Sequence, residues 1–562
     1  MIRVSVFYGY LASLLAAAAI LQASPAWEAK TRRRVRLWRV YTSAGELIFA
    51  LLTLALLVWW TYHSFALGSF KLGPGEVPQD LKQGGASIGH VLNLLLGLSI
   101  LPVGKCSSLS SAFGLSWERA TAYHRILGGV ALVMVMVHVG LEISLWISKG
   151  TLVQNLFHYV TINWDQSVWP WIIPVMELLA LSIVPAALAT FPPVRRRCYN
   201  LFYRLHLVLP LLVVASFAHS WDFWQFGVVG LQLYLLDKLE LAGMLLYGRR
   251  RTELLLVQAI GRDIVALTLR VSGQTTITPG QVMYLHIPSI STVQWHPFTA
   301  AWSDKSHAAA VSAGEAADCT IQHHIKASDS KATWTRALYD AASVHGQVPL
   351  RIQTIGPFGG VSHLVETASR QQLLVAGGVG VTPISALLGA FTEARSAAGD
   401  LEGSSGGVAA GLRLVWIARE LELFVEYAET LEAVLRLPNA RILLFLTAKS
   451  QPVPNTLLRD HVSDVESPSS AEGEMNALDA LPASVRACLH FERPDLRCVV
   501  PDLILELLNS NVLHDPNRVQ RESESAVSVF TCGPAPLELA VHSACCRFSN
   551  AEVELTSMNF SL

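Results

Sequence analysis

Residues 122–146 read AYHRILGGVALVMVMVHVGLEISLW, a stretch long and apolar enough to cross a membrane as one helix. It carries two histidines, His124 and His138, separated by fourteen positions. Because a helix rises 1.5 Å per residue, the two imidazoles are expected ~20 Å apart along its axis and near one face. Strongly polar side chains are costly inside a membrane, so both histidines are candidate functional residues.

A second apolar stretch, residues 203–220, carries a matching pair, His206 and His219, thirteen positions apart. Both stretches are predicted to run from the inside outward, so His124 is expected to face His206 at the inner depth. His138 is expected to face His219 at the outer depth. Two imidazoles on one haem iron leave no open coordination position, which suits electron transfer. The spacing therefore predicts two stacked b-type haems, with four hydrogen-bonded core histidines as the alternative.

Other apolar segments indicate that a large part of the chain lies in lipid. The chain has 562 residues, of which 52% are hydrophobic and 15% charged. Candidate spans all fall in its first half, at residues 4–22, 46–64, 87–103, 122–146, 169–191, 203–220 and 223–243. Residues 4–22 also resemble a cleavable signal peptide, so six or seven spans are expected.

Basic residues follow every second span, and this alternation sets the orientation. By the positive-inside rule, the basic junctions and the second half of the chain lie inside. All eight cysteines fall in predicted inside segments, where thiols stay reduced, and the net charge of -1 gives no indication of nucleic-acid binding. The basic residues are Lys30, Arg32, Arg33, Arg34, Arg36 and Arg39 after the first span, Lys105 and Arg119 after the third, Arg195, Arg196 and Arg197 after the fifth, and Arg249, Arg250 and Arg251 after the seventh.

After residue 250 the pattern changes to short alternating stretches at residues 253–258, 264–270 and 282–287, separated by glycine and proline. This pattern predicts a small antiparallel barrel, a fold that suits a flavin. His323 and His324 lie in this soluble half and are expected to be exposed to solvent. Residues 396–411 and 460–492 lack a regular period and are predicted to be surface insertions.

Residues 371–391, QQLLVAGGVGVTPISALLGAF, predict a buried strand, a tight turn and a helix. Glycines 377, 378 and 380 would let the backbone approach a pyrophosphate, whose charge the helix amino terminus favours. Thr382 and Pro383 open the helix, and proline suits its first turn. The prediction is a nucleotide-binding turn, with a purely structural turn as the alternative.

Two further predicted strands end at the same edge of the sheet. One ends on Arg419 and the other on Cys532, followed by Gly533 and Pro534. Because ligands bind beyond the carboxyl ends of strands in open α/β sheets, Arg419 is a candidate to hold a ribose 2′-phosphate. Cys532 is a candidate neighbour of the nicotinamide. The alternative for Arg419 is a solvated strand end.

Taken together, the four membrane histidines and the motifs HPFT, GPFGG, GGVGVTP and CGP resemble the ferric reductase and NADPH oxidase superfamily over nearly the whole chain. The resemblance implies a transmembrane di-haem domain at 1–248, a cytosolic FAD-binding β-barrel at 249–366 and an α/β NADPH-binding domain at 367–562, as in ferredoxin reductases. It also implies cofactor contacts by particular residues. These are His296, Pro297, Phe298, Thr299, Lys326 and Thr335 for FAD; Gly377, Gly378, Gly380, Thr382, Pro383, Arg419, Gly533 and Pro534 for NADPH; Cys532 near the hydride path; and Phe560 as a candidate aromatic cover of the flavin.

Two departures from the family pattern bear on the flavin. Ala300, Ala301 and Trp302 follow HPFT where relatives place Ser or Thr, and the chain ends in Leu562 where many ferric reductases have Trp. The resemblance implies electron transfer from cytosolic NADPH through FAD and two haems to an acceptor outside. The outside loops are short, and only residues 220–222 join the last two spans, so ferric or cupric chelates are favoured over oxygen.

The alternatives are an oxidase that makes superoxide, a transporter with a histidine proton path, and a subunit that relays electrons to a partner. The plasma membrane is the default location. The sequence predicts no oligomeric state and does not distinguish NADPH from NADH.

Overall fold

The computed structural model describes residues 2–22, 34–37, 40–66, 77–101, 113, 115, 117–156, 172–220, 223–246, 252–271, 280–292, 294–302, 319–329, 333–343, 350–358, 371–399, 411–447, 477–512, 527–549 and 552–558. The chain forms two compact units. The first comprises residues 1–33 and 43–243, and the second comprises residues 34–42 and 244–562.

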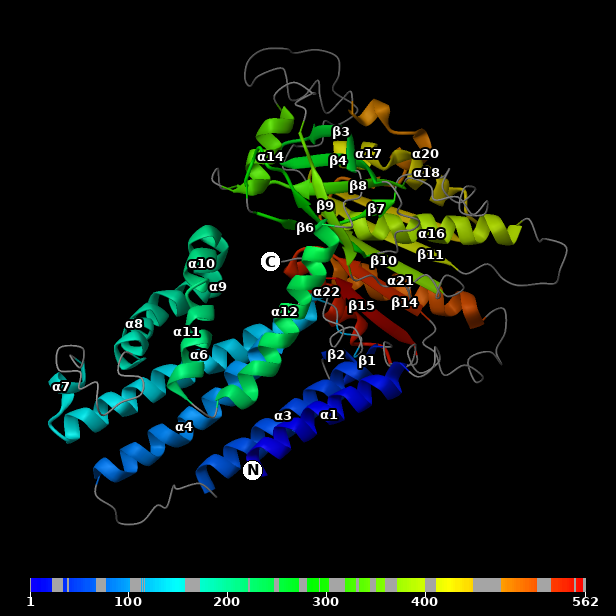
Figure 1. The fold of residues 1–562 in the computed structure, drawn as a ribbon. Coiled ribbons are helices and arrows are strands. Elements are labelled where there is room, and N and C mark those ends of the chain that lie inside the picture. Colours follow the sequence, from blue (N-terminus) through cyan, green and yellow to red (C-terminus); the bar gives the residue numbers. More distant parts are fainter. Residues whose placement is uncertain are drawn as a thin grey trace. The chain divides into compact units, whose positions relative to one another are not determined.

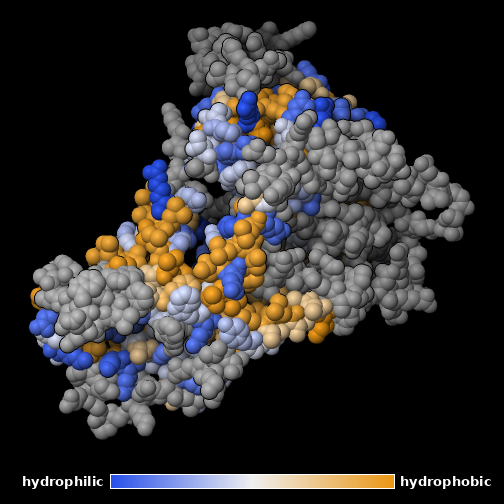
Figure 2. Space-filling model, in the orientation of Figure 1, coloured by the Kyte–Doolittle hydropathy of each residue, from blue (hydrophilic) through white to orange (hydrophobic). Residues whose placement is uncertain are grey.

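The first unit is a helical bundle, and each predicted span coincides with one helix or, for the sixth, with two successive helices. Large hydrophobic side chains point outward from it, such as Leu54 at 56%, Val133 at 63% and Leu181 at 75% exposure, as expected of a surface that faces lipid (Figure 2). The helices are α1 (Ile2–Gln22), α3 (Ala44–Ala66), α4 (Val77–Ile100), α6 (Trp117–Ser148), α7 (Leu152–Leu156), α8 (Ile172–Thr190), α9 (Pro192–Arg197), α10 (Tyr199–His206), α11 (Leu209–His219) and α12 (Trp224–Leu246).

Among the described residues, three helical stretches are long and apolar enough to cross a membrane: Ala44–Ala66, Arg119–Ser148 and Leu201–His219. The first predicted span, α1, packs one face against α3, where the Tyr10 and Thr53 hydroxyls are 2.9 Å apart. Helix α4 begins ten residues before the predicted third span and is 24 residues long. The ten added residues include Asp80 and Lys82, so the predicted apolar span forms only the later part of this helix.

The sixth predicted span is not one continuous helix. Helix α10 ends at His206, and α11 begins at Leu209 with Pro210 in its first turn. Proline has no N–H to donate to the carbonyl four residues earlier, which here is that of His206. The break therefore lies directly after the inner histidine, and the sequence contained its signal.

Small residues let α4 approach its neighbours closely. A Cβ added to Gly97 would lie 2.7 Å from the Cβ of Phe226 on α12, and one added to Gly230 would lie 3.1 Å from the Gly97 carbonyl oxygen. Such close backbone approach is typical of helix packing in membranes. Helix α4 is thereby held between α12 and α6.

The second unit begins with the predicted antiparallel barrel, built from a four-stranded sheet in the order β3-β4-β8-β7 and a three-stranded sheet in the order β6-β5-β9. Its apolar core includes Leu267, Leu285 and Ile321, and helix α14 adds Trp334 and Leu338. The elements are β3 (Thr252–Ile260), β4 (Ile264–Val271), β5 (Val282–His286), β6 (His296–Thr299), β7 (Ala301–Trp302), β8 (Cys319–Lys326), α14 (Trp334–Ser343) and β9 (Gln353–Phe358).

A parallel sheet with helices on both faces follows, in the order β13-β12-β11-β10-β14-β15 (Figure 1). Alternate strand residues face opposite layers: Leu374 packs with α16 and α18, whereas Leu373 packs with α21 and α22. The elements are β10 (Gln371–Gly377), the 3₁₀ turn η5 (Gly378–Gly380), α16 (Val381–Gly399), β11 (Leu412–Ala418), α17 (Glu422–Glu426), α18 (Ala428–Leu435), β12 (Ala440–Leu446), α20 (Ala483–Arg486), β13 (Leu489–His490), α21 (Leu496–Val512), β14 (Val527–Cys532), α22 (Ala535–Cys545) and β15 (Val553–Met558). The linker after α1 forms a separate two-stranded sheet, β1 (Arg34–Leu37) and β2 (Val40–Ser43).

The predicted insertion at residues 460–492 is only partly described, and its second part belongs to the fold. Leu481 and Val485 are buried in the core beside α18, and β13 extends the sheet. The prediction was wrong for this part because two apolar anchors do not produce a visible period. Of the other predicted insertion, residues 400–410 lie outside the described residues.

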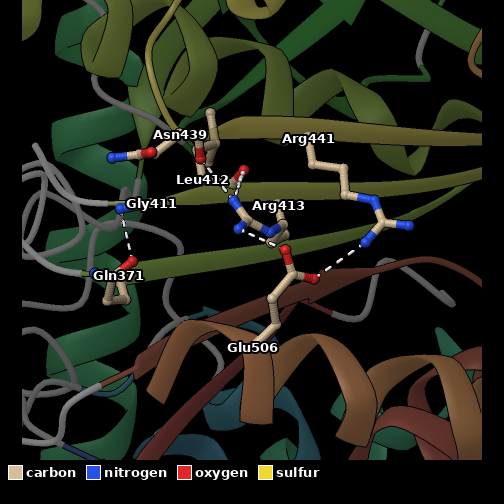
Figure 3. Close-up of polar contacts among 7 residues, drawn as sticks. All are labelled: Gln371, Gly411, Leu412, Arg413, Asn439, Arg441 and Glu506. Atoms are coloured by element: carbon tan, nitrogen blue, oxygen red, sulfur yellow. Dashed lines mark hydrogen bonds and ion pairs between the residues drawn. The ribbon is translucent and has the colours of Figure 1, made fainter. Parts of the chain in front are cut away.

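Polar contacts close the amino ends of the central strands, away from the strand ends that carry the glycine turn. Glu506 on α21 accepts hydrogen bonds from Arg413 on β11 at 2.8 Å and from Arg441 on β12 at 3.1 Å (Figure 3). Arg413 is 8% exposed and also donates to the Asn439 carbonyl at 2.6 Å. This buried cation is therefore compensated on both sides.

Candidate functional site

The two histidines of α6 are anchored in the same way on α4. Nδ1 of His124 donates to the Ser99 carbonyl at 2.8 Å, and Nδ1 of His138 donates to the Gly85 carbonyl at 3.1 Å. A carbonyl only accepts, so each Nδ1 carries a proton and Nε2 is left to bind a metal. Ser99 and Gly85 are themselves fourteen residues apart on the antiparallel helix, which matches the spacing of the histidines.

At the inner position, His206 lies opposite His124. Their ring centroids are 6.1 Å apart and their planes are inclined by 29°. Two imidazole nitrogens each about 2 Å from one metal would place the ring centroids roughly 6 Å apart. The pair therefore fits an axial ligand set for a haem iron.

An ion pair fixes the inner end of α6 beside this pair. Arg119 donates from Nη2 to both carboxylate oxygens of Glu46 on α3, each at 2.6 Å, and the Tyr123 hydroxyl is 3.3 Å from Glu46 Oε1. Glu46 is buried, so its charge is compensated by neighbours rather than by water. Tyr123 adjoins His124, so the ion pair fixes the start of α6 where it presents the inner imidazole.

The outer pair consists of His138 on α6 and His219, the last residue of α11. Gly89 leaves room for the His138 ring, because an added Cβ would be 3.4 Å from its Cε1. On the other side, Asn93 of α4 donates to the Ser220 hydroxyl at 2.8 Å, directly after His219. Helix α4 thus contacts the segments that carry both outer imidazoles.

In the barrel, the aromatic residues of the predicted flavin motif stack on one another. The His296 ring lies 4.6 Å from that of Trp334, and the Phe298 ring lies 5.7 Å from it. Thr335 accepts a hydrogen bond from the Ser328 backbone N–H at 3.1 Å, and Lys326 forms an ion pair with Asp263 at 3.2 Å. This platform of π surfaces and polar groups is compatible with the isoalloxazine ring and the pyrophosphate of FAD.

His323 and His324 are buried, so the expectation that they are exposed was wrong. Strand β8 lies between β4 and β7, and its alternate residues point to opposite faces. His323 enters the barrel core and donates from Nδ1 to the Thr299 carbonyl at 2.8 Å. Burial lowers the pKa of His323 to about 4. The sequence pattern did not reveal that His323 holds the last residue of the HPFT motif by a hydrogen bond.

The glycine turn lies at the carboxyl end of β10, between the ends of β11 and β14. The chain leaves β10 for strands on one side and returns through β14 on the other, which makes this the switch point of the sheet. Gly378 has φ of +56°, and a Cβ added to Gly380 would lie 2.3 Å from the Cys532 carbonyl oxygen. The two predicted nucleotide motifs therefore pack directly against each other.

The remaining predicted contacts differ in exposure. Arg419 is exposed at the end of β11, whereas Thr382 is buried and its hydroxyl donates to the Val379 carbonyl at 2.8 Å. Burial raises the pKa of Cys532, so its thiol stays protonated. Phe560 lies outside the described residues.

Gly380→Ala should abolish NADPH binding, because the new methyl group would collide with the Cys532 carbonyl of the adjacent strand end. Gly389→Ala is the matched control on α16, since a Cβ there meets nothing within 4 Å and alanine favours a helix. Nucleotide affinity and the thermal unfolding midpoint should both fall only in the first variant. Equal affinities for the two variants would contradict the close approach.

Acidification should destabilise the barrel through His323. Its folded pKa of about 4 lies below the ordinary value near 6.5, so the unfolded chain takes up the proton first as the pH falls. The loss should reach about 2 kcal/mol at pH 5. Unfolding midpoints of the detergent-purified chain between pH 7.5 and 5 should show a shallower pH dependence in His323→Leu. An unchanged slope would contradict this role.

Comparison with known proteins identifies the domains of the chain. Family models match in succession: "Ferric reductase like transmembrane component" at residues 88–217, "FAD-binding domain" at 249–362 and "Ferric reductase NAD binding domain" at 370–546. Ferric reduction oxidase 4 of Arabidopsis thaliana is 26% identical over 62% of this chain and 47% of its own length. NADPH oxidase 3 of Rattus norvegicus is 24% identical over 54% of this chain and 48% of its own.

Among solved structures, the flavohemoglobin of Malassezia yamatoensis matches with a TM-score of 0.36 and 14% identity. The match covers 86% of this chain and 97% of the flavohemoglobin chain. The chain spans about half the length of the curated relatives it matches. With one transmembrane and two cofactor-domain matches in order, it belongs to the ferric reductase and NADPH oxidase superfamily.

Proposed function

We propose that the chain is a ferric-chelate reductase that carries electrons from cytosolic NADPH to Fe(III) chelates, or Cu(II), on the outer side of the membrane. One NADPH and two Fe(III) give NADP⁺, a proton and two Fe(II). The observation that carries the proposal is the His124–His206 pair, 6.1 Å apart between ring centroids, with the His124 tautomer fixed by a backbone carbonyl.

FAD, when bound, would accept two electrons from NADPH and release them one at a time, and bis-imidazole haems would carry single electrons through the bundle. The residues hold these groups. His124 with His206 would ligate the inner haem, and His138 with His219 the outer one. The carbonyls of Ser99 and Gly85 would fix the orientation and the Nδ1–H tautomer of the α6 imidazoles, which leaves Nε2 to bind the metal.

For the flavin, His296, Phe298 and Trp334 would supply the aromatic platform, and His323 would hold the Thr299 backbone in place. Pro297, Lys326 and Thr335 complete the proposed flavin contacts. Lys326 already pairs with Asp263, so an approaching phosphate would compete with that carboxylate for it.

At the nucleotide site, Gly377, Gly378, Gly380, Thr382 and Pro383 would bind the pyrophosphate at the amino end of α16. The aligned N–H groups there favour an anion. The exposed guanidinium of Arg419 would bind the 2′-phosphate, and Gly533 and Pro534 would keep the buried Cys532 beside the nicotinamide.

A metal ion is the favoured acceptor because the predicted connection from His219 to α12 is too short to cap the outer haem. Residues 221 and 222 of that connection lie outside the described residues. The match to NADPH oxidase 3 supports a second candidate, reduction of oxygen to superoxide. The nucleotide-binding turn argues against a histidine proton path or a relay subunit without its own donor.

Replacing His138 or His219 by leucine should remove the outer haem. Bound haem should fall from two per chain to one, and external reduction should stop, while NADPH still reduces FAD. His63→Gln on α3 is the control and should keep both haems. Pyridine haemochrome content and the optical spectrum measure the result. A two-haem spectrum in either leucine variant would refute the ligand assignment, and no haem absorbance in the parent chain would refute the whole proposal.

The acceptor is decided by comparing products under air in one detergent-purified, FAD-supplied sample. With NADPH and a ferric chelate, the yield of Fe(II) should exceed that of superoxide. Superoxide dismutase distinguishes Fe(III) reduced directly from Fe(III) reduced by superoxide. Superoxide as the dominant product would make the oxidase the correct assignment.

A further inference from the structure

The flavin-binding barrel and the nucleotide-binding sheet share a buried hydrogen bond. The Tyr427 hydroxyl lies 2.8 Å from Nδ1 of His324, although the two residues are 103 positions apart. His324 lies on β8 of the barrel, and Tyr427 lies between α17 and α18 of the sheet domain. His324 is 6% exposed and Tyr427 5%, so water does not compete for the bond.

The direction of this hydrogen bond follows from the surrounding charge. Glu426 places a carboxylate oxygen 3.6 Å from Nε2 of His324. That charge favours a proton on Nε2, which leaves Nδ1 of the neutral ring to accept the Tyr427 proton. Burial raises the pKa of Tyr427, so the hydroxyl remains a donor.

Tyr427 is also linked to the nucleotide turn through Trp416. Its ring packs edge-on against Trp416 at 5.5 Å, and the Trp416 indole N–H donates to the Gly378 carbonyl at 3.0 Å. Gly378 is the turn residue with positive φ.

The neighbouring residue on β8 completes a link to the flavin motif. His323 points to the opposite face and donates to the Thr299 carbonyl. One strand is thus linked to the HPFT motif through one face and, by way of Tyr427 and Trp416, to the nucleotide turn through the other.

We propose that His324 and Tyr427 are positioning residues that set the distance between the nicotinamide and the flavin. The inference rests on the proposed function, because it assigns NADPH and FAD to these two motifs. It goes beyond that function by giving a role to two residues outside the predicted flavin and nucleotide motifs.

Tyr427→Phe removes only the hydroxyl. Anaerobic mixing with NADPH should show flavin reduction about tenfold slower at saturating nucleotide, while NADP⁺ affinity and FAD content change less than twofold. Tyr339→Phe is the matched control, since it removes a 2.7 Å bond to the Gly261 carbonyl from the same barrel, and it should reduce flavin at the parent rate. If Tyr427→Phe lost both its affinity for NADP⁺ and its bound FAD, the role of Tyr427 would be purely structural and the proposal would be overturned.

A double-mutant cycle tests the pair itself. His324→Leu should slow flavin reduction as much as Tyr427→Phe, and the double variant should be no slower than either. His324→Gln, which retains an acceptor, should restore part of the rate. The unfolding midpoints of the parent chain, the two single variants His324→Leu and Tyr427→Phe, and the double variant, measured without nucleotide, should show the same non-additivity. Multiplicative rate effects would show that the residues act independently and overturn the pairing.

The two proposals fail in different ways. A parent chain whose flavin is not reduced by NADPH contradicts the proposed function, whereas the stability cycle still reports on the pair. A parent chain that is reduced, with Tyr427→Phe reduced equally fast, contradicts only the positioning role.

Discussion

The structure of the membrane unit depends on two side-chain-to-backbone hydrogen bonds between α4 and α6. The carbonyls of Ser99 and Gly85 accept from His124 and His138, and these two bonds hold α4 and α6 in one register. A shift of either helix by one residue would break both bonds together. Gly97 and Asn93 on α4 then contact α12 and the end of α11, respectively.

In the second unit, the corresponding constraint is the close approach of two strand ends. Gly380 against the Cys532 carbonyl leaves no room for any side chain, so the turn that opens α16 and the motif that ends β14 are effectively one element. Trp416 and Tyr427 extend this element toward the barrel through buried polar contacts. The aromatic residues therefore have polar as well as packing roles.

Much of this arrangement could be predicted from sequence because it follows from local patterns. Apolar length located the spans, and glycine spacing located the turn. The facing of His124 and His206 followed from orientation and depth. Burial of His323 and His324 could not be predicted, because a two-residue polar pair is typical of a surface until the strand order is known. The Tyr427 contact joins distant segments and has no local signal, whereas Pro210 did carry one for the break in the sixth span.

That break divides the segment carrying His206 and His219 into two short helices. On an unbroken helix, any insertion before one imidazole would rotate the other by about 100° per residue, since a turn takes 3.6 residues. With a joint at residues 207 and 208, changes in α10 reorient the inner ring without turning the outer one. The orientations of His206 and His219 can therefore change separately in evolution, whereas His124 and His138, which share the continuous helix α6, can only move as a pair.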